Sequence, residues 1–222
     1  MRFKLFARLA ALEGVELYML AGALLLLCLL ILLAVRRGRG ADRSTQERPG
    51  RTRLLVYGAM SLTLSFILSY MKLFSMPFGG SITLFSMLPL IVYAWAFGPA
   101  AGFLAGLAYS LLQMTQGVWV VHWLQFLLDY LVAFTLLGIA GFLPGSLPAA
   151  AAAAGFARML CSTVSGAVFF ADGGLEYGIS NPWVYSLLYN GLTIGADTLL
   201  CVLAACLPPL RRTVGRLLKG RG

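Results

Sequence analysis

Charged residues are scarce in this sequence. They make up 11% of its 222 residues, whereas 60% are hydrophobic and the mean hydropathy is +0.86. An ordinary globular domain carries about 25% charged residues, so this composition excludes that class. Several apolar runs have the length of about 17–25 residues with which a helix crosses a bilayer. The sequence therefore predicts an integral membrane protein.

Histidine and lysine are almost absent, which excludes several kinds of chemistry. The sequence has one histidine, His122, which is too little to build a histidine-based metal site and makes a serine–histidine catalytic pair improbable. The sequence has three lysines and no GxxxxGK[ST] motif, so it cannot hydrolyse ATP by a P-loop. The cysteines lack metal-ligand spacing, and we interpret them as apolar packing residues: Cys28, Cys161, Cys201 and Cys206. We predict no enzyme activity, no metal and no cofactor.

Apolar runs long enough to be transmembrane helices define the predicted fold. We expect helices at 15–35, 54–73, 81–97, 99–116, 123–143, 147–170 and 183–208. Gly, Pro and Asn mark the breaks between them. The prediction is an all-α, polytopic membrane helix bundle, a six-helix core plus one extra N-terminal transmembrane helix. Its domains are an anchor (1–36), a basic cytoplasmic linker (37–53), the six-helix membrane domain (54–210) and a basic cytoplasmic tail (211–222).

Basic residues gather in two short segments, RRGRGADRSTQERPGRTR (36–53) and RRTVGRLLKGRG (211–222). By the positive-inside rule both are cytoplasmic, which places the C-terminus inside a multi-pass protein of the cell membrane. The loops at 74–80, 117–122 and 171–182 then face outward. Because the basic residues flank membrane spans, topology and anionic membrane lipid account for the net charge of +9, and we predict no nucleic-acid partner.

Asp129 lies inside a predicted span, where a carboxylate costs several kcal/mol unless its charge is offset. Counting from the outer helix ends puts Asp129, Ser162 and Asn190 at a shared depth of about 9–12 Å. They form either one small-ligand pocket or three separate interhelical hydrogen bonds. Arg158 and Asp197 are expected deeper, as a pair that neutralises itself. Asp129 is then either protonated or the partner of a cationic ligand.

Four stretches carry a family resemblance. They read PFGGSITLFSMLPLIVYAWAFGPAAGFLAGLAYSLLQ (77–113), HWLQFLLDYLVAFTLLGIAGF (122–142), RMLCSTVSGAVFF (158–170) and NPWVYSLLYN (181–190). In order and spacing they resemble the thiamine-specific substrate-binding (S) component of energy-coupling factor (ECF) vitamin transporters, over about residues 55–208. The resemblance implies a six-helix bundle that captures the vitamin near its outer face, under the loop between its first two helices.

The resemblance also implies ligand-binding residues. Asp129 and Tyr130 match an acidic–aromatic pair whose carboxylate bonds the aminopyrimidine, and Tyr185 and Asn190 match a tyrosine-x4-asparagine element. Aromatic faces suit a thiazolium ring by stacking and cation–π attraction. Ser162 stands where the resemblance leads us to expect a histidine; it donates a hydrogen bond but carries no charge, so the ligand is thiamine or a thiamine precursor or analogue. The remaining candidates in these stretches are His122, Phe170 and Trp183.

Partner subunits are implied as well, because the chain has no ATP-hydrolysing motif of its own. The resemblance implies a transmembrane scaffold (T) subunit and two cytoplasmic ATPase subunits. Small residues let helices approach closely within a membrane. The span at 54–73 offers Ala59, Ser61, Thr63 and Ser65, which serve either this interface or the internal packing of the bundle. By resemblance we predict the interface.

Two other functions are open at this point. An intramembrane aspartyl-type protease needs two carboxylates within hydrogen-bonding distance, and the depths of Asp129 (about 9 Å) and Asp197 (about 21 Å) argue against that contact. A self-sufficient secondary transporter is expected to show an internal repeat with interrupted helices, and we find none in the sequence.

Overall fold

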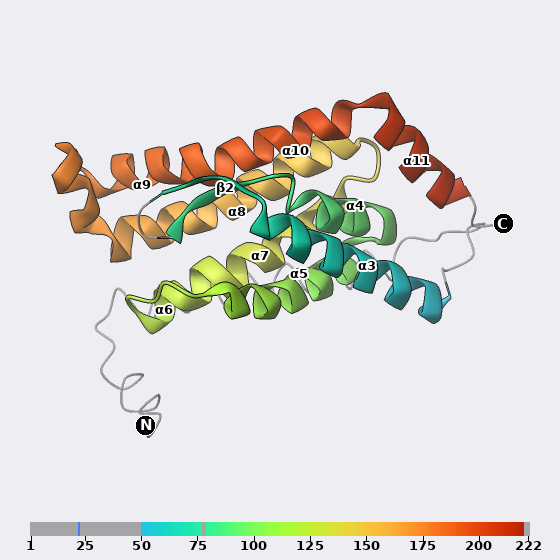
Figure 1. Cartoon of the computed structure of the whole chain (residues 1–222), viewed down its shortest axis with the longest axis horizontal. Coiled ribbons are helices and arrows are strands. Elements are labelled where there is room, and N and C mark those ends of the chain that lie inside the picture. The colour runs from blue at the N-terminus through green and yellow to red at the C-terminus, as the bar shows by residue number, and fades with distance from the viewer. Residues whose placement is uncertain (1–21, 23–49, 77–78, 220–222) are drawn as a thin grey trace, which may run out of the picture.

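The structure is a computed structural model that describes residues 22, 50–76 and 79–219 (Figure 1). The predicted anchor (1–36) and nearly all of the predicted linker (37–53) lie outside the described residues. The long helices run roughly side by side, with α6 (Trp123–Phe126) and α9 (Pro182–Asn190) at one end and α11 (Pro208–Lys219) at the other.

Apolar run length predicted most of the helices correctly. Among the described residues, four helical stretches are long and apolar enough to cross a membrane: α3 (Arg51–Tyr70), Trp123–Phe142, α8 (Leu147–Phe169) and Pro182–Cys206. Each matches a predicted span to within three residues at either end. Helix α5 (Pro99–Gln113) and the 3₁₀ turn η2 (Met114–Gln116) fill the predicted span at 99–116. The predicted span at 81–97 is wrong in its first part, because helix α4 is limited to Leu88–Phe97.

Two of the long helices contain π-helical segments. The first consists of α6, π-helical η3 (Leu127–Val132), α7 (Ala133–Thr135) and 3₁₀ segment η4 (Leu136–Phe142). The second consists of α9, π-helical η6 (Gly191–Gly195) and α10 (Ala196–Cys206). A π segment widens one turn of the helix and rotates the side chains that follow, and such segments are frequent at functional sites.

Helices α4, α5 and η4 pack so closely that the contact requires glycine. A Cβ on Gly102 would lie 2.4 Å from Ala94 Cβ, and one on Gly106 would lie 2.5 Å from the carbonyl oxygen of Phe134. The Gly102–Gly106 pair therefore packs inside the bundle, against Ala94 and Gly138 on one side and Phe134 and Thr135 on the other.

Helix α3 presents its small residues on two different sides. Ser65 is fully buried, and its carbonyl oxygen accepts a hydrogen bond from Tyr109 Oη (3.2 Å). Ser61 is half-buried, whereas Ala59 and Thr63, one helical turn apart, are exposed. The structure thus divides the predicted partner face: Ser65 belongs to the internal packing, and the outward side of α3 carries Ala59 and Thr63.

An antiparallel hairpin of β1 (Lys72–Ser75) and β2 (Ser81–Thr83) follows α3, where the sequence predicted the end of one helix, a loop and the start of the next. The Gly80 N–H donates a hydrogen bond to Tyr189 Oη (2.9 Å), which attaches the hairpin to α9. This pairing explains why α4 starts late: residues 81–83 are extended in a strand and leave only the following residues to form the helix.

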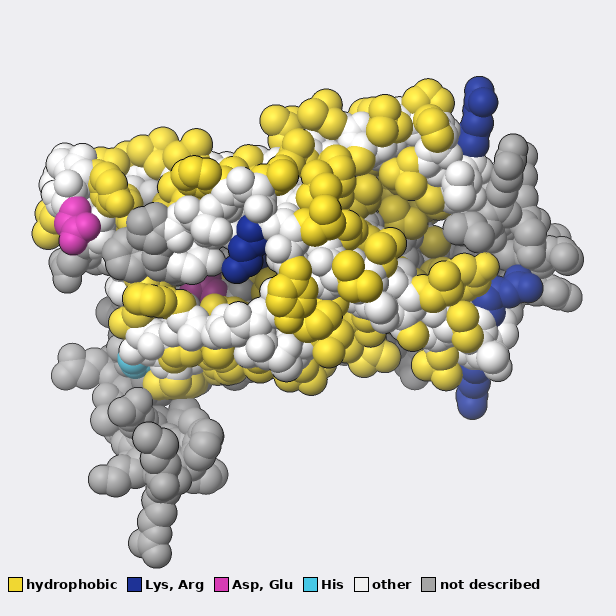
Figure 2. Space-filling model, viewed as in Figure 1, with side chains coloured by type: hydrophobic (Ala, Val, Ile, Leu, Met, Phe, Trp, Pro, Cys, Tyr) yellow, Lys and Arg dark blue, Asp and Glu magenta, His cyan; other side chains and the backbone are white. Residues whose placement is uncertain are grey.

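The C-terminal segment predicted as a tail is helical. Helix α11 begins at the Pro208–Pro209 pair after α10 and packs through Val214, which is 4% exposed. Arg212 of α11 is exposed, as are Arg51 and Arg53 at the start of α3. Figure 2 shows Lys and Arg side chains gathered at this end of the molecule. One end of the bundle is therefore basic, opposite the end that carries the hairpin.

Candidate ligand-binding site

A cavity of about 210 Å³ lies beside the hairpin, between α5, α8 and the two helices that contain π segments. Its charged lining residues are Lys72, Asp129, Arg158 and Asp197. Its aromatic lining residues are Trp119, Tyr130, Phe134, Phe170, Tyr185 and Tyr189. A concave site with aromatic walls and a few polar groups is the usual form of a small-molecule site.

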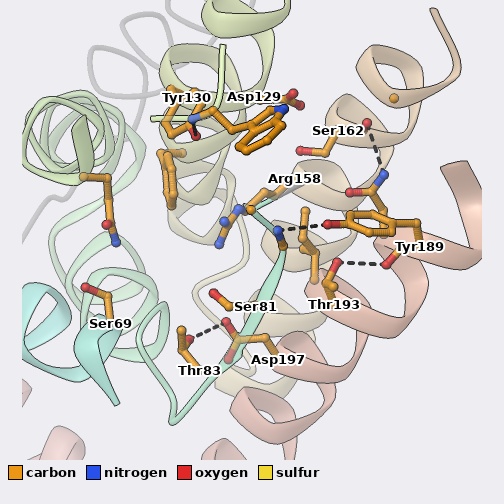
Figure 3. A pocket seen from close by; sticks show the side chains of 18 of the residues that line it. Ser69, Ser81, Thr83, Asp129, Tyr130, Arg158, Ser162, Tyr189, Thr193 and Asp197 are labelled. Carbon is orange, nitrogen blue, oxygen red and sulfur yellow. Dashed lines mark hydrogen bonds between the residues drawn. The ribbon is translucent and has the colours of Figure 1, made fainter. Parts of the chain in front are cut away.

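Asp129 projects from the π-helical segment η3 and lines the cavity (Figure 3). Its Oδ2 accepts hydrogen bonds from Gln125 Nε2 (2.9 Å) and Ser165 Oγ (3.0 Å). The Ser162 side chain, on the wall of the same cavity, also lies close to this carboxylate. Two donors thus hold Oδ2, while the carboxylate lies on the wall of the cavity.

Aromatic side chains from three elements surround this carboxylate. Tyr130 Oη accepts a hydrogen bond from the Trp119 N–H (3.1 Å), so the loop before α6 is attached to the next residue after Asp129. On the facing helix the rings of Tyr185 and Tyr189 lie 6.1 Å apart. These rings provide flat apolar walls against which a planar heterocycle can stack.

Asn190 and Ser162 both line the cavity, as does Asp129, so the three residues of the predicted layer come together. Asn190 also forms an interhelical contact, since its Nδ2 donates to the carbonyl oxygens of Ser162 (3.2 Å) and Ser186 (3.0 Å). Both interpretations of the sequence therefore describe part of the structure: the pocket exists, and Asn190 joins two of its walls.

Arg158 and Asp197 do not form the predicted self-neutralising pair. The Arg158 Cζ lies 4.1 Å from the centroid of the Phe134 ring, and its buried Nε has no hydrogen-bond partner among the described residues. Asp197 Oδ2 accepts from Thr83 Oγ1 of the hairpin (2.8 Å), and its Oδ1 has no partner in the described chain. Figure 3 shows Arg158 between the level of Asp129 and that of Asp197.

Both of these charges line the same cavity as Asp129, which corrects the predicted separation into two layers. Residue counting estimates the depth of a side chain along its helix, but it does not say which way that side chain points. No hydrogen bond joins Asp129 to Asp197 within the described residues, because each carboxylate has its own donors. The arrangement therefore lacks the shared proton of an aspartyl protease.

Two predicted site residues lie outside the cavity lining. His122 caps α6 through Nδ1, which accepts from the Leu124 N–H (3.2 Å), and its ring stacks on Phe169 at 5.0 Å. Trp183 is 55% exposed in the first turn of α9. Lys72 of the hairpin, which was not among the predicted site residues, lines the cavity.

Sequence reasoning missed two residues that contact the predicted site. Tyr189 lines the cavity and binds the hairpin, but it stands next to Asn190 in an ordinary helical run and has no distinguishing signal. Gln125 did have a recognisable signal in the sequence, because it precedes Asp129 by four residues, the spacing at which side chains of one helix meet.

Within the described residues, apolar helices long enough to cross a membrane surround a cavity lined by acidic, basic and aromatic side chains, which defines a polytopic membrane protein with a candidate site for a small polar ligand. Over residues 55–216 the sequence matches the thiamine transporter protein family (Thia_YuaJ), and the chain belongs to this family. It is therefore a multi-pass membrane protein of a transporter family and not an enzyme.

Individual relatives agree with this assignment. The thiamine transporter ThiT of Bacillus subtilis (strain 168) is 34% identical over 161 residues, which are 65% of this chain and 82% of that protein. A solved structure of ThiT from Listeria monocytogenes shares the fold, with a TM-score of 0.59 and 22% identity over 78% of this chain and 96% of that chain. The family predicted from the sequence is confirmed.

Proposed function

We propose that the protein is the substrate-binding membrane subunit of an ECF-type importer, which captures thiamine or a close relative at the outer face. The observation that carries the proposal is Asp129: a carboxylate with no ion pair among the described residues lines an aromatic-walled cavity in a member of a thiamine transporter family. A buried carboxylate of this kind gains most from a ligand that brings positive charge and hydrogen-bond donors.

Thiamine has the chemistry that these side chains require. Its thiazolium ring is a planar cation, and the walls formed by Tyr130, Tyr185 and Tyr189 offer cation–π attraction and stacking. Its aminopyrimidine has an amino group that donates to Asp129 and ring nitrogens that accept hydrogen bonds. Arg158 supplies a donor for such acceptors, since its buried Nε has no hydrogen-bond partner among the described residues.

Ser162 sets the expected limit on affinity. A serine provides one hydroxyl but neither the ring nor the charge of a histidine. Phe170 faces the same cavity and adds an apolar surface. We propose that this combination accepts thiamine precursors or analogues as well as thiamine.

Uptake requires energy, and we propose that a T subunit and two cytoplasmic ATPase subunits supply it. Contact with the T subunit is assigned to the outward side of α3, where Ala59 and Thr63 are exposed beside the half-buried Ser61. Small residues at this surface permit close helix approach. The basic end of the bundle, with Arg51, Arg53 and Arg212, is placed in the cytoplasm together with the C-terminus.

The test is purification under native conditions, followed by mass spectrometry of the small molecules that copurify and by titration of the purified protein with thiamine. We expect a thiamine-like compound at one molecule per chain. Recovery of a flavin or a neutral vitamin in its place would refute the specificity and leave the transporter class intact.

A further inference from the structure

We propose that Gln125 is a positioning residue of the ligand site, which aims the Asp129 carboxylate and fixes the outer loop that carries Trp119 to it. The inference rests on the proposed function, because it concerns how the same site recognises a cationic ligand. Gln125 lines the cavity but is not a free group: the residue is 3% exposed, and its side-chain amide is hydrogen-bonded at both ends.

Gln125 makes three hydrogen bonds through one amide. Its Nε2 donates to Asp129 Oδ2 (2.9 Å) and to the carbonyl oxygen of Trp119 (3.3 Å), and its Oε1 accepts from the Val121 N–H (3.2 Å). An amide nitrogen has two hydrogens, so both donors are used. The chemistry of the partners fixes the orientation of the amide, because a carboxylate and a carbonyl only accept and an N–H only donates.

The loop is held from a second side by Tyr130. The Trp119 N–H donates to Tyr130 Oη (3.1 Å), while the Trp119 carbonyl oxygen accepts from Gln125. The residues that hold Trp119 therefore lie four positions before and one position after Asp129 in the same helix. Because Trp119 lines the cavity, this arrangement places an aromatic wall and the carboxylate in a fixed relation.

The consequence for binding follows from which oxygen is occupied. Gln125 and Ser165 both donate to Oδ2 of Asp129, which restrains the orientation of the carboxylate on the cavity wall. Without Gln125 the carboxylate loses one of these donors and is less restrained, and the loop loses the hydrogen bonds at the Trp119 carbonyl oxygen and at the Val121 N–H. A cationic ligand depends on the position of the Asp129 charge, so it should lose more affinity than a neutral ligand of the same shape. The neutral ligand binds mainly through contacts with the cavity walls.

The experiment compares two substitutions and two ligands. Gln125→Met keeps the length of the side chain and removes its hydrogen bonds. Gln116→Met is the matched control, since Gln116 also lines the cavity but its Nε2 donates to Ser69 Oγ (2.6 Å) and not to Asp129. The ligands are thiamine and an uncharged analogue in which a benzene ring replaces the thiazolium. Dissociation constants are measured by calorimetric titration of the full-length protein in detergent.

We expect Gln125→Met to weaken thiamine about 10-fold and the neutral analogue no more than about threefold, the scale of one hydrogen bond to a charged group. Gln116→Met should change both affinities by the same factor. In an Asp129→Asn background, Gln125→Met should alter thiamine binding by less than about twofold, because its effect acts through the carboxylate.

A second substitution keeps the test decisive if Gln125→Met does not fold. Ser165→Ala removes the other donor to Oδ2 and leaves the loop contacts in place, so it should also weaken thiamine more than the neutral analogue. Equal losses for both ligands in Gln125→Met, or in Ser165→Ala where only that variant folds, would overturn the positioning role while the proposed function stands. Failure of the wild-type protein to bind thiamine would overturn the proposed function and this inference with it.

Discussion

Replacing Asp129 by asparagine tests whether this carboxylate serves the ligand or the fold. The two side chains have the same shape, so the substitution changes charge and one hydrogen-bonding group only. A structural aspartate with a buried cationic partner would cost stability when neutralised. Asp129 has no such ion pair among the described residues, so its neutralisation should affect binding and leave the fold intact.

The expected magnitude follows from the partners of the two carboxylate oxygens. An asparagine at this position retains one oxygen that can accept from Gln125 and Ser165, so the contacts within the bundle persist. Toward the cavity it offers an NH₂ group in place of a charged oxygen. The ligand then loses a charge-assisted hydrogen bond of about 1.5–3 kcal/mol, which corresponds to about a 10- to 150-fold increase in the dissociation constant.

Titration with thiamine, followed by intrinsic tryptophan fluorescence, measures this loss, since Trp119 lines the cavity. Thermal unfolding in detergent measures stability on the same samples. Glu176→Gln is the matched control: Glu176 is exposed in η5 (Ala171–Tyr177), and its neutralisation should change affinity by less than about twofold. Unchanged affinity of Asp129→Asn, together with a large fall in melting temperature, would refute the assignment of Asp129 to the ligand.

Four further substitutions test other parts of the site and the proposed interface. Arg158→Met should weaken thiamine about 10-fold without lowering the melting temperature in the same detergent assays, because it removes a buried charge that has no ion pair in the described chain. Thr63→Leu should reduce copurification with the T subunit while ligand affinity is kept, whereas Ser65→Leu should lower the melting temperature, since Ser65 is fully buried. Gly80→Ala should speed thiamine dissociation about fivefold in stopped-flow measurements, because its Cβ would lie 2.3 Å from Tyr189 Oη and disturb the contact between the hairpin and α9. Equal rates in Gly80→Ala and wild type would contradict the expectation that the segment between the first two helices of the bundle covers the vitamin.

The sequence alone was enough to determine the membrane class and most of the spans, and most of the site residues predicted from it line the cavity. Span length is a one-dimensional property, since the thickness of the bilayer fixes how many apolar residues a helix needs. The same argument located Asp129 as a charge that needs a partner. Tyr130, Tyr185 and Asn190 followed from a resemblance in local spacing, and the structure places all three in the cavity lining.

Only the tertiary structure decided which side chains face one another. Arg158 and Asp197 were expected to pair, but the rotation of their helices points both into the cavity without joining them. The hairpin depends on pairing between segments on either side of a turn and on a hydrogen bond from Gly80 to Tyr189, 109 residues away along the chain. Ser65 was assigned to an outer surface because residue spacing defines a helix face but does not show what covers it. The length of a span and the depth of a residue in it follow from positions along the chain. The direction in which a side chain points and the residues it contacts are decided only when the helices pack together.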